Sequence, residues 1–336
     1  MMILACGSEG AQLPTGGHVD KLDLLVLGEA NVDLIVRAED PTPAFGQEKL
    51  VQDLMLTLGG SASIFACQAA KLGLRTALAG VVGGDEFGAY VLRTLSAQGV
   101  DTARIRRASE LKTGVTVSLT APHDRALLTY LGTIAALEST MIHPAWVAEA
   151  RHVHVASYFL QPALAPGLPG LLAHARQAGA TVSLDTGWDP ADRWDDGLAA
   201  TLAQVDLFLP NEAEALRITG QATAEAALAD LASRIPTVAI KLGANGAMAR
   251  RAGETARVRA IPVQVIDTTG AGDSFDAGFV YGCLRGLPLA ECLELGAICG
   301  GLSTRAPGGT ASQPTLREVE AFRSTRAAPA PSDNTE

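Results

Sequence analysis

Cysteine is scarce in this sequence and forms no pattern. The 336-residue chain has five cysteines, an odd number, and no two of them are spaced as CxxC. Neither a disulfide framework nor a cysteine-based zinc site is therefore predicted. Unpaired thiols favour a reducing compartment, so we expect a cytoplasmic protein.

Basic residues are also in short supply. Lysine and arginine number 26 against 36 aspartates and glutamates, which gives a formal net charge of -10. Nucleic-acid backbones and anionic membrane surfaces both need a basic face, so neither is an expected partner. No apolar run reaches the length of a membrane span either. An anionic small substrate stays open, because helix N-termini bind anions without net positive charge.

A dinucleotide fingerprint is missing as well. An NAD-dependent oxidoreductase would carry GxGxxG after its first strand, and this chain has Gly28-Glu29-Ala30-Asn31-Val32-Asp33 at that place. That class of enzyme is excluded. Aromatic residues make up only 4% of the chain, which weighs against a ligand pocket lined by aromatic rings.

What the chain does have is a regular alternation of short apolar runs with longer helical patterns. The runs typical of buried strands lie at 23–28, 76–82, 152–156, 181–185, 206–210 and 237–242. The helical patterns lie at 61–72, 86–98, 167–178, 212–218, 222–234, 272–285 and 289–302. This alternation predicts an α/β fold of three layers, a doubly wound and mostly parallel sheet between two layers of helices.

Two stretches, at about 32–58 and 111–133, carry strand patterns without helices. We expect them to form a small β lid over the carboxyl ends of the main strands, where ligands bind in such folds. Residues 1–20 are predicted to be a flexible leader and residues 324–336 a disordered tail. The folded domain would then span residues 21–323.

The densest chemical signal is the segment Asp267-Thr268-Thr269-Gly270-Ala271-Gly272-Asp273, which leads into an apolar helix. Free backbone N–H groups at a helix start, together with the helix dipole, attract anions. Asp273 falls in the first helical turn, where a carboxylate can accept the proton of an attacking hydroxyl. The dipole is expected to keep the pKa of this carboxyl low. An alternative interpretation is that Asp273 only caps the helix.

This segment resembles the second signature of the ribokinase-like (PfkB) carbohydrate kinases, in which DTxGAGD supplies the anion hole and the catalytic base. Further places are similar to that family and follow in its order, at 28–33, 59–63, 83–88 and 210–214. The resemblance covers about residues 22–322. It implies ATP-dependent phosphorylation of a hydroxyl group of a small sugar or sugar-like substrate, with Asp273 as base and the N–H groups of Gly270, Ala271 and Gly272 as anion hole.

The resemblance also implies the ligands of ATP and metal ions. The residues that would contact ATP are Asn211, Lys241, Gly243, Ala244, Gly246 and Gly272. Asn211 and Glu214 would hold Mg²⁺, largely through water, although as a bare pattern they are a helix capping box. Asn245-Gly246 is by itself an ordinary hairpin turn. In many relatives a potassium ion is enclosed beside a loop that matches 302–312 here, and its ligands would include Asp267, Thr269 and Ser312.

On the acceptor side, the resemblance implies binding by Asn31, Asp33, Gly59 and Gly60 together with Asp273. An isolated aspartate at a strand end is more often a turn former, so Asp33 has that alternative. One position departs from the family, because Ile64 stands where an asparagine usually bonds the sugar. The missing contact would be altered or supplied from elsewhere, and Gln161 is the candidate. Two other features are Asp276, where many relatives carry asparagine, and Asp185, which could reach the phosphates or the substrate.

Several alternatives stay beside this interpretation. A nucleoside kinase of the same family is the nearest one, and the low aromatic content tilts away from it. A catalytically silent ligand-binding relative is disfavoured because Gly270, Gly272 and Asp273 are all present. His152 and His154 share one face of a predicted strand, but no third metal ligand lies near them in sequence. Relatives often pair through their lids, which allows a homodimer.

Overall fold

The computed structural model describes residues 22–121 and 125–327. The predicted leader at 1–20 lies outside the described residues, as does the predicted tail beyond Ala327. None of the helices in the described ranges has the length and hydropathy that a bilayer crossing requires.

Within these ranges, nine strands form one large sheet in the order β13-β12-β11-β10-β9-β8-β1-β4-β5. The strands from β11 to β5 pair in parallel, and β12 and β13 pair antiparallel at one edge. The six predicted strands are all present. The strand bounds are β1 Leu22–Leu27, β4 Thr76–Gly83, β5 Ile105–Ala108, β8 Ala150–Val155, β9 Thr181–Leu184, β10 Leu207–Phe208, β11 Thr237–Lys241, β12 Ala247–Arg251 and β13 Glu254–Val258.

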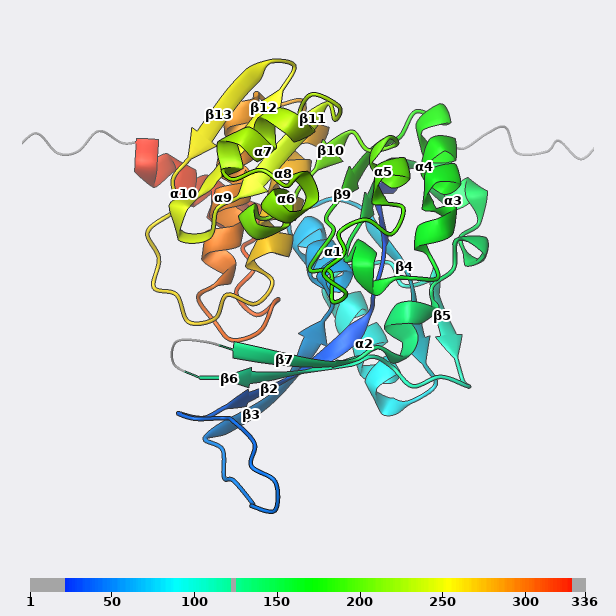
Figure 1. Ribbon diagram of the computed structural model, residues 1–336, viewed down its shortest axis with the longest axis vertical. Helices are drawn as coiled ribbons and strands as arrows, with labels where there is room; N and C mark the ends of the chain where they lie inside the picture. The colour runs from blue at the N-terminus through cyan, green and yellow to red at the C-terminus, as the bar shows by residue number, and fades with distance from the viewer. Residues whose placement is uncertain (1–21, 122–124, 328–336) are drawn as a thin grey trace, which may run out of the picture.

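Helices cover both faces of this sheet (Figure 1), and each face has its own buried apolar cluster. One cluster packs under α1 Ser61–Lys71, α2 Glu86–Ala97, α8 Ala271–Leu284, α9 Leu289–Ser303 and α10 Leu316–Ala327. The other packs under α3 Pro144–Glu149, α4 Leu168–Gln177, α5 Leu198–Leu202, α6 Glu212–Thr219 and α7 Ala224–Leu231. Short 3₁₀ turns lie at Gly132–Ala136, Ser139–Met141, Tyr158–Leu160, Ala165–Gly167 and Gly243–Asn245. The predicted three-layer, mostly parallel α/β fold is confirmed.

The predicted lid is a second, four-stranded sheet that projects from the main body (Figure 1). Its strands are β2 Asn31–Arg37, β3 Asp53–Gly59, β6 Val115–Thr120 and β7 Arg125–Tyr130, in the order β3-β2-β6-β7. The hairpin pairs β2–β3 and β6–β7 are antiparallel, and β2 pairs with β6 in parallel. Because β2 follows β1 after only three residues, the lid stands at the carboxyl ends of the parallel strands.

One predicted boundary needs correction, and one pair of strands was missed. The edge hairpin β12–β13 was not predicted, because its strands mix apolar residues with arginine and glutamate, as edge strands do. The disordered tail was predicted to begin at 324, but α10 continues to Ala327. Arg323 fixes the end of this helix, because its guanidinium pairs with Glu291 and Glu294 of α9 at 2.9 and 3.0 Å.

Candidate active site

The turn before α8 is built around a glycine. Gly270 adopts the left-handed conformation at φ 71°, and a Cβ there would lie 2.8 Å from Ile64 Cγ2 and 2.9 Å from Gly309 Cα. Only glycine meets both constraints. The Ala271 N–H donates to the Thr268 carbonyl at 3.2 Å. Among the described residues no side chain caps the start of α8, so this helix tip can receive an anion.

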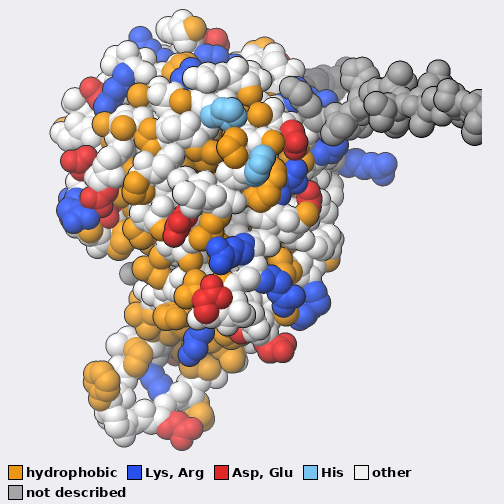
Figure 2. All heavy atoms as spheres, turned by 90° about the vertical axis from the view of Figure 1, so that its right-hand side faces the viewer, with side chains coloured by type: hydrophobic (Ala, Val, Ile, Leu, Met, Phe, Trp, Pro, Cys, Tyr) orange, Lys and Arg blue, Asp and Glu red, His pale blue; other side chains and the backbone are white. Residues whose placement is uncertain are grey.

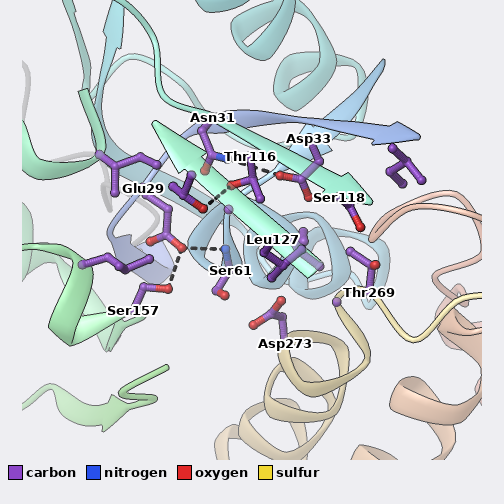
Figure 3. A pocket seen from close by; sticks show the side chains of 17 residues that line it. Glu29, Asn31, Asp33, Ser61, Thr116, Ser118, Leu127, Ser157, Thr269 and Asp273 are labelled. Atoms are coloured by element: carbon purple, nitrogen blue, oxygen red, sulfur yellow. Dashed lines mark hydrogen bonds between the residues drawn. The ribbon is translucent and has the colours of Figure 1, made fainter. Parts of the chain in front are cut away.

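Asp273 lies in the first turn of α8, and its carboxylate points into a pocket under the lid (Figure 3). This orientation favours a role in the pocket over a role as a helix cap alone, and the role of Asp273 as base stays a prediction. The pocket has a volume of about 270 Å³. Its walls come from the β1–β2 connection, the lid strands β2, β6 and β7, the start of α1, the turn after β8 and the tip of α8. The polar residues lining it are Glu29, Asn31, Asp33, Ser61, Thr116, Ser118, Thr129, Ser157, Thr269 and Asp273.

The predicted turn Gly59-Gly60 lies directly against two of these polar side chains. A Cβ on Gly59 would lie 2.0 Å from Asp33 Oδ1, and a Cβ on Gly60 would lie 2.5 Å from Asn31 Oδ1. The two glycines therefore let the carboxylate and the amide stand beside the turn. Asn31 also donates to Asp33 at 3.4 Å, so the two side chains orient one another (Figure 3).

Glu29 is a pocket residue for which no role was predicted from sequence. It is 3% exposed, and its Oε1 accepts from the Ser61 N–H and from the Ser157 hydroxyl, both at 2.7 Å. Ser157 holds a left-handed backbone conformation at φ 51°, which is uncommon for a residue with a side chain. This carboxylate thus ties the start of α1 to the turn after β8, and both segments line the pocket.

Of the two residues discussed for the missing asparagine contact, Ile64 lines the acceptor pocket and Gln161 does not. Ile64 lines the pocket but is only 3% exposed, and it packs between Gly270 and Gly309 under the α8 tip. Gln161 does not line the pocket. Its Nε2 donates to the Ala156 carbonyl at 2.5 Å, and the nearby Ser157 and Leu160 line the pocket instead. Gln161 is therefore not the residue that replaces the missing asparagine contact.

A second pocket, of about 430 Å³, opens on the other side of the same helix tip. Lys241, Gly243, Ala244, Gly246 and Gly272 line it, together with apolar residues that include Ile261, Val263, Phe275 and Ala297. The lysine, the alanine at 244 and the three glycines are the residues predicted to contact ATP; of that predicted set, only Asn211 does not line this pocket. The 242–246 segment is also the turn between β11 and β12, so the hairpin interpretation and a role in this pocket hold together. Thr269, Gly270 and Asp273 face the first pocket, while Thr268, Ala271 and Gly272 face the second.

Lys241 supplies a buried positive charge beside this tip. Its Nζ donates to Asp185 Oδ2 at 2.5 Å and to Asp276 Oδ2 at 2.9 Å, and a Cβ on Gly272 would lie 3.5 Å from Nζ. Burial alone would lower the pKa of Lys241, but the two carboxylates outweigh burial and raise it. For Asp185, burial alone would raise the pKa, and Lys241 outweighs it and lowers the pKa to about 2. The ammonium group is therefore charged and held in place.

Asn211 and Glu214 form the capping box that was their alternative interpretation. Asn211 Oδ1 accepts from the Glu214 N–H, and Glu214 Oε2 accepts from the Asn211 N–H, both at 2.9 Å. Burial raises the pKa of Glu214 to about 7, and the charge of Asp185 adds to that rise. The described residues contain no group of three acidic, histidine or cysteine side chains fit to hold a metal ion. Mg²⁺ that arrives with phosphate would suit such a site, because it keeps much of its water shell.

The predicted potassium ligands lie around one loop. Asp267 Oδ1 accepts from the Thr269 N–H at 2.9 Å and from its hydroxyl at 2.8 Å, and Oδ2 accepts from the Gly308 N–H at 2.8 Å. Ser312 donates to the Ser303 carbonyl at 2.6 Å. Asp267 thereby joins the turn before α8 to the loop after α9.

The paired histidines are structural. His152 and His154 both hydrogen-bond the Ser183 hydroxyl at 2.7 Å, His152 also bonds Thr181 at 2.7 Å, and the ring of His154 stacks on Phe65. Burial lowers the pKa of both histidines. They form neutral links across the sheet.

The pKa of Asp273 differs from the sequence expectation. Burial raises it to about 7, and the charge of Asp185 adds to the rise while Lys241 opposes it. The expected low value was wrong, because partial burial next to other carboxylates outweighs the helix dipole. A carboxyl group whose pKa lies near neutral pH is better suited to act as a general base.

Activity should therefore fall as the pH drops through about 7. Asp273 accepts a proton only when it is ionised, so kcat/KM for the acceptor at saturating ATP should rise with pH and level off above about 7. Glu214 titrates in the same range, and the Glu214→Gln variant should keep the acidic limb of the profile. A profile of the parent enzyme that stays flat between about pH 5.5 and 8 would contradict this assignment.

The fold and the two pockets define the class of protein. The sheet is mostly parallel and has a lid at the carboxyl ends of its strands. The helix tip at Gly270 lies between a polar pocket and a largely apolar one. This arrangement is typical of a ribokinase-like kinase. The model of the pfkB family carbohydrate kinases matches residues 21–316. The chain belongs to this family, whose members are ATP-dependent kinases with an alcohol group as acceptor.

Known relatives are named for different substrates. A 2-dehydro-3-deoxygluconokinase of Bacillus subtilis is 31% identical over 323 residues, covering 90% of this chain and 96% of the relative. An ATP-dependent ribose-1-phosphate kinase of Halopiger xanaduensis is 32% identical over 304 residues, covering 90% and 98%. The structure of Arabidopsis thaliana ribokinase with ribose and ATP superimposes with a TM-score of 0.77 at 26% identity, covering 90% and 98%.

Proposed function

We propose that this chain transfers the terminal phosphoryl group of ATP to a hydroxyl group of a small sugar-like acceptor, with Asp273 as the base. One observation carries the proposal. The first turn of α8 separates two pockets, and successive residues of one turn face the polar pocket or the apolar one. An acceptor hydroxyl on one side and a nucleotide on the other would meet at this turn.

The chain's own groups account for the chemistry. Asp273 orients the acceptor hydroxyl and takes its proton as the oxygen attacks phosphorus. The N–H groups of Gly270, Ala271 and Gly272 stabilise charge on the transferring phosphoryl oxygens. The Ala271 N–H would give up its hydrogen bond to the Thr268 carbonyl and donate to the phosphate instead. Because the transition state is loose, such positioning and electrostatics matter more than a strong base. Lys241 supplies the fixed positive charge below the tip.

Two groups of side chains would hold the metal ions. Asn211 and Glu214 would hold Mg²⁺ through water, and the ion neutralises phosphate charge when it is bound. Asp267, Thr269 and Ser312 would hold potassium together with carbonyls of the 302–312 loop. The ion would stiffen the connection between that loop and the anion hole, since Asp267 already joins them.

Two observations favour a sugar-like acceptor over the alternatives. Among the described residues, those that line the acceptor pocket include no aromatic side chain, whereas a nucleoside base is often held by stacking. A silent relative is disfavoured, because Gly270, Gly272 and Asp273 are all present, and Gly270 and Asp273 line the acceptor pocket. Free thiols at the four described cysteines also fit a cytoplasmic enzyme.

The direct test is ADP release by the purified full chain over a panel of sugars and nucleosides, with Mg²⁺ and with either potassium or sodium. We expect ADP release that depends on a sugar-like acceptor and is faster in potassium. Acceptor-dependent release with nucleosides alone would favour the nucleoside kinase. Equal rates in both salts would remove the potassium site from the proposal.

We also infer that two copies pair through their lids. Large exposed hydrophobic side chains gather on the lid strands and on the β2–β3 connection, among them Phe45, Leu50, Leu54, Leu128 and Tyr130. Figure 2 shows such side chains at the lid end of the molecule. Contiguous exposed apolar surface usually marks an interface. A Leu54→Asp/Leu128→Asp variant should shift sedimentation from dimer to monomer. Trp188→Ser, at an exposed aromatic outside the lid, should leave the dimer intact. A parent chain that sediments as a monomer at high concentration would contradict the inference.

A further inference from the structure

Two cysteines lie around one arginine, at the end of α8 opposite to its tip. Cys283 belongs to the last turn of α8 and Cys292 to the first turn of α9. Arg251 is the last residue of β12, and its Nη2 donates to both sulfurs, at 2.8 Å from Cys283 Sγ and 3.8 Å from Cys292 Sγ. One cation therefore brings the two thiols together.

The backbones of the two helices also approach closely at this level. A Cβ on Gly282 would lie 2.9 Å from Cys292 Cα and 3.0 Å from Cys292 Sγ. The absence of a side chain on Gly282 lets α8 and α9 come into contact beside the two cysteines. A disulfide needs Cα atoms no more than about 7 Å apart, and helices in such close contact bring facing residues into that range.

One of the two thiols opens into another pocket, of about 430 Å³. This pocket lies at the amino ends of the parallel strands, because the first residues of β8, β9, β10 and β11 line it. Arg251 and Cys283 also line it, whereas Cys292 is fully buried. A small oxidant that enters the pocket can therefore reach Cys283, on the edge of the sheet opposite the lid.

The surroundings favour a thiolate in this pair. Contact with Cys283 lowers the pKa of Cys292 to about 7, and Arg251 supports this change while burial opposes it. The same contact raises the pKa of Cys283, with burial adding to the rise. The thiolate is the reactive form of cysteine, and a neighbouring arginine favours it. Burial instead raises the pKa of Cys67 and of Cys299 to about 12, so we expect those two thiols to be inert.

We propose that Cys283 and Cys292 form a redox-active dithiol, which hydrogen peroxide oxidises to an intramolecular disulfide. The proton of Cys283 passes to the Cys292 thiolate, and the Cys283 sulfur then attacks one peroxide oxygen. The O–O bond breaks, which leaves a sulfenic acid on Cys283 and a hydroxide that takes the proton of Cys292 and becomes water. Cys292 attacks the oxidised sulfur, the S–S bond forms, and the hydroxyl group leaves as a second water with a proton from solvent. Two electrons pass from the sulfurs to the peroxide.

This disulfide would protect the protein rather than switch the kinase off. Only residues 284–291 separate the two cysteines in sequence, and the disulfide of a short loop restricts the chain less than that of a long one. It does prevent Cys283 from advancing to the sulfinic and sulfonic acids, which thiol reductants do not reverse. A thiol reductant would restore both cysteines.

The test is peptide mapping of the purified full chain after treatment with hydrogen peroxide and alkylation of the remaining thiols. Trypsin places Cys283 in peptide 260–285 and Cys292 in peptide 286–305, which also contains Cys299. We expect the two peptides to be joined with the loss of two hydrogens, and dithiothreitol to separate them. Cys299→Ala should keep the link and Cys292→Ser should abolish it. In Cys292→Ser, sulfinic and sulfonic acids should accumulate at Cys283 instead.

The Arg251→Met variant tests the assigned cation. The rate of disulfide formation at neutral pH should fall at least about 5-fold, because a smaller fraction of the pair is thiolate. Arg250→Met is the matched control, because successive residues of a strand point to opposite faces, and it should leave the rate unchanged. If Arg251→Met does not fold, the peptide map of the parent chain still decides the question.

The contradicting outcomes are equally specific. Cys283 and Cys292 that stay fully alkylatable, under peroxide treatment that oxidises free glutathione, would overturn the proposal. A link from either residue to Cys6 in place of the link between them would do the same. An unchanged rate in folded Arg251→Met would overturn the activation by arginine. Every readout is a peptide mass or a free thiol, so the result does not depend on the proposed kinase activity.

Discussion

Replacing Asp273 by asparagine should lower kcat by about 10²- to 10⁴-fold, the range that general-base catalysis contributes. Asparagine has nearly the same shape but cannot take the proton of the acceptor hydroxyl. Binding of ATP should be unchanged, because the nucleotide pocket is lined by Ala271 and Gly272 and not by Asp273. The measurements are single-turnover phosphorylation and ATP titration by calorimetry.

The same variant should be no less stable than the parent, and this serves as its control. The folded-state pKa of Asp273 is raised to about 7, so the ionised carboxylate opposes folding above that pH and asparagine removes the penalty. Asp230→Asn, at an exposed ion pair on α7, should keep full activity. Turnover of Asp273→Asn at the parent rate would show that another group takes the proton.

Replacing Lys241 by methionine should destabilise the fold by about 3–5 kcal/mol, the usual cost of breaking a buried ion pair by removing one partner. The change leaves Asp185 and Asp276 buried without their shared cation, and their side chains are 9% and 1% exposed. The free energy of unfolding in urea measures the loss. Activity should fall as well, because the positive charge beside the anion hole is removed.

A second substitution separates charge from packing at this site. Lys241→Met/Asp276→Asn should recover part of the lost stability, because one of the two unpaired carboxylates is removed. Arg257→Met, which breaks the exposed pair with Glu225, should cost no more than about 1 kcal/mol. If Lys241→Met lowers the free energy of unfolding no more than Arg257→Met does, Lys241 is not coupled to its two buried carboxylates in the way that the distances indicate.

The parts of the molecule that could be predicted from sequence are those encoded by neighbouring residues. The buried parallel strands are continuous apolar runs, as β1 illustrates with Leu24–Leu27 fully buried. The helix tip at 267–273 is one uninterrupted turn and helix start, so its geometry and its resemblance to a family signature could both be found. The edge strands β12 and β13 carry no such run and were missed.

The side chains that depend on distant segments could not be assigned. Glu29 lies inside a segment that was singled out, but its role requires the start of α1, which comes 32 residues later. Lys241 was assigned to ATP by resemblance alone, because its partners come from the end of β9 and from α8. Gln161 was the candidate from sequence, and Ser157 was not considered. Ser157 has a left-handed backbone and lines the pocket, whereas Gln161 does not.

The prediction of a low pKa for Asp273 was wrong for a related reason. Its position at a helix start can be inferred from sequence, and the dipole effect follows. Its burial and the approach of Asp185 come from the packed structure, and they exceed the local effect.

The most direct test of the central claim is a crystal structure of the Asp273→Asn variant with ATP, Mg²⁺ and the best acceptor from the panel. The γ-phosphate should lie at the N–H groups of Gly270, Ala271 and Gly272. An acceptor hydroxyl should lie within about 2.6–3.2 Å of the residue 273 side chain, on the lid side of the turn. A γ-phosphate bound away from this helix tip, or an acceptor outside the pocket that contains Glu29 and Asp33, would contradict the account.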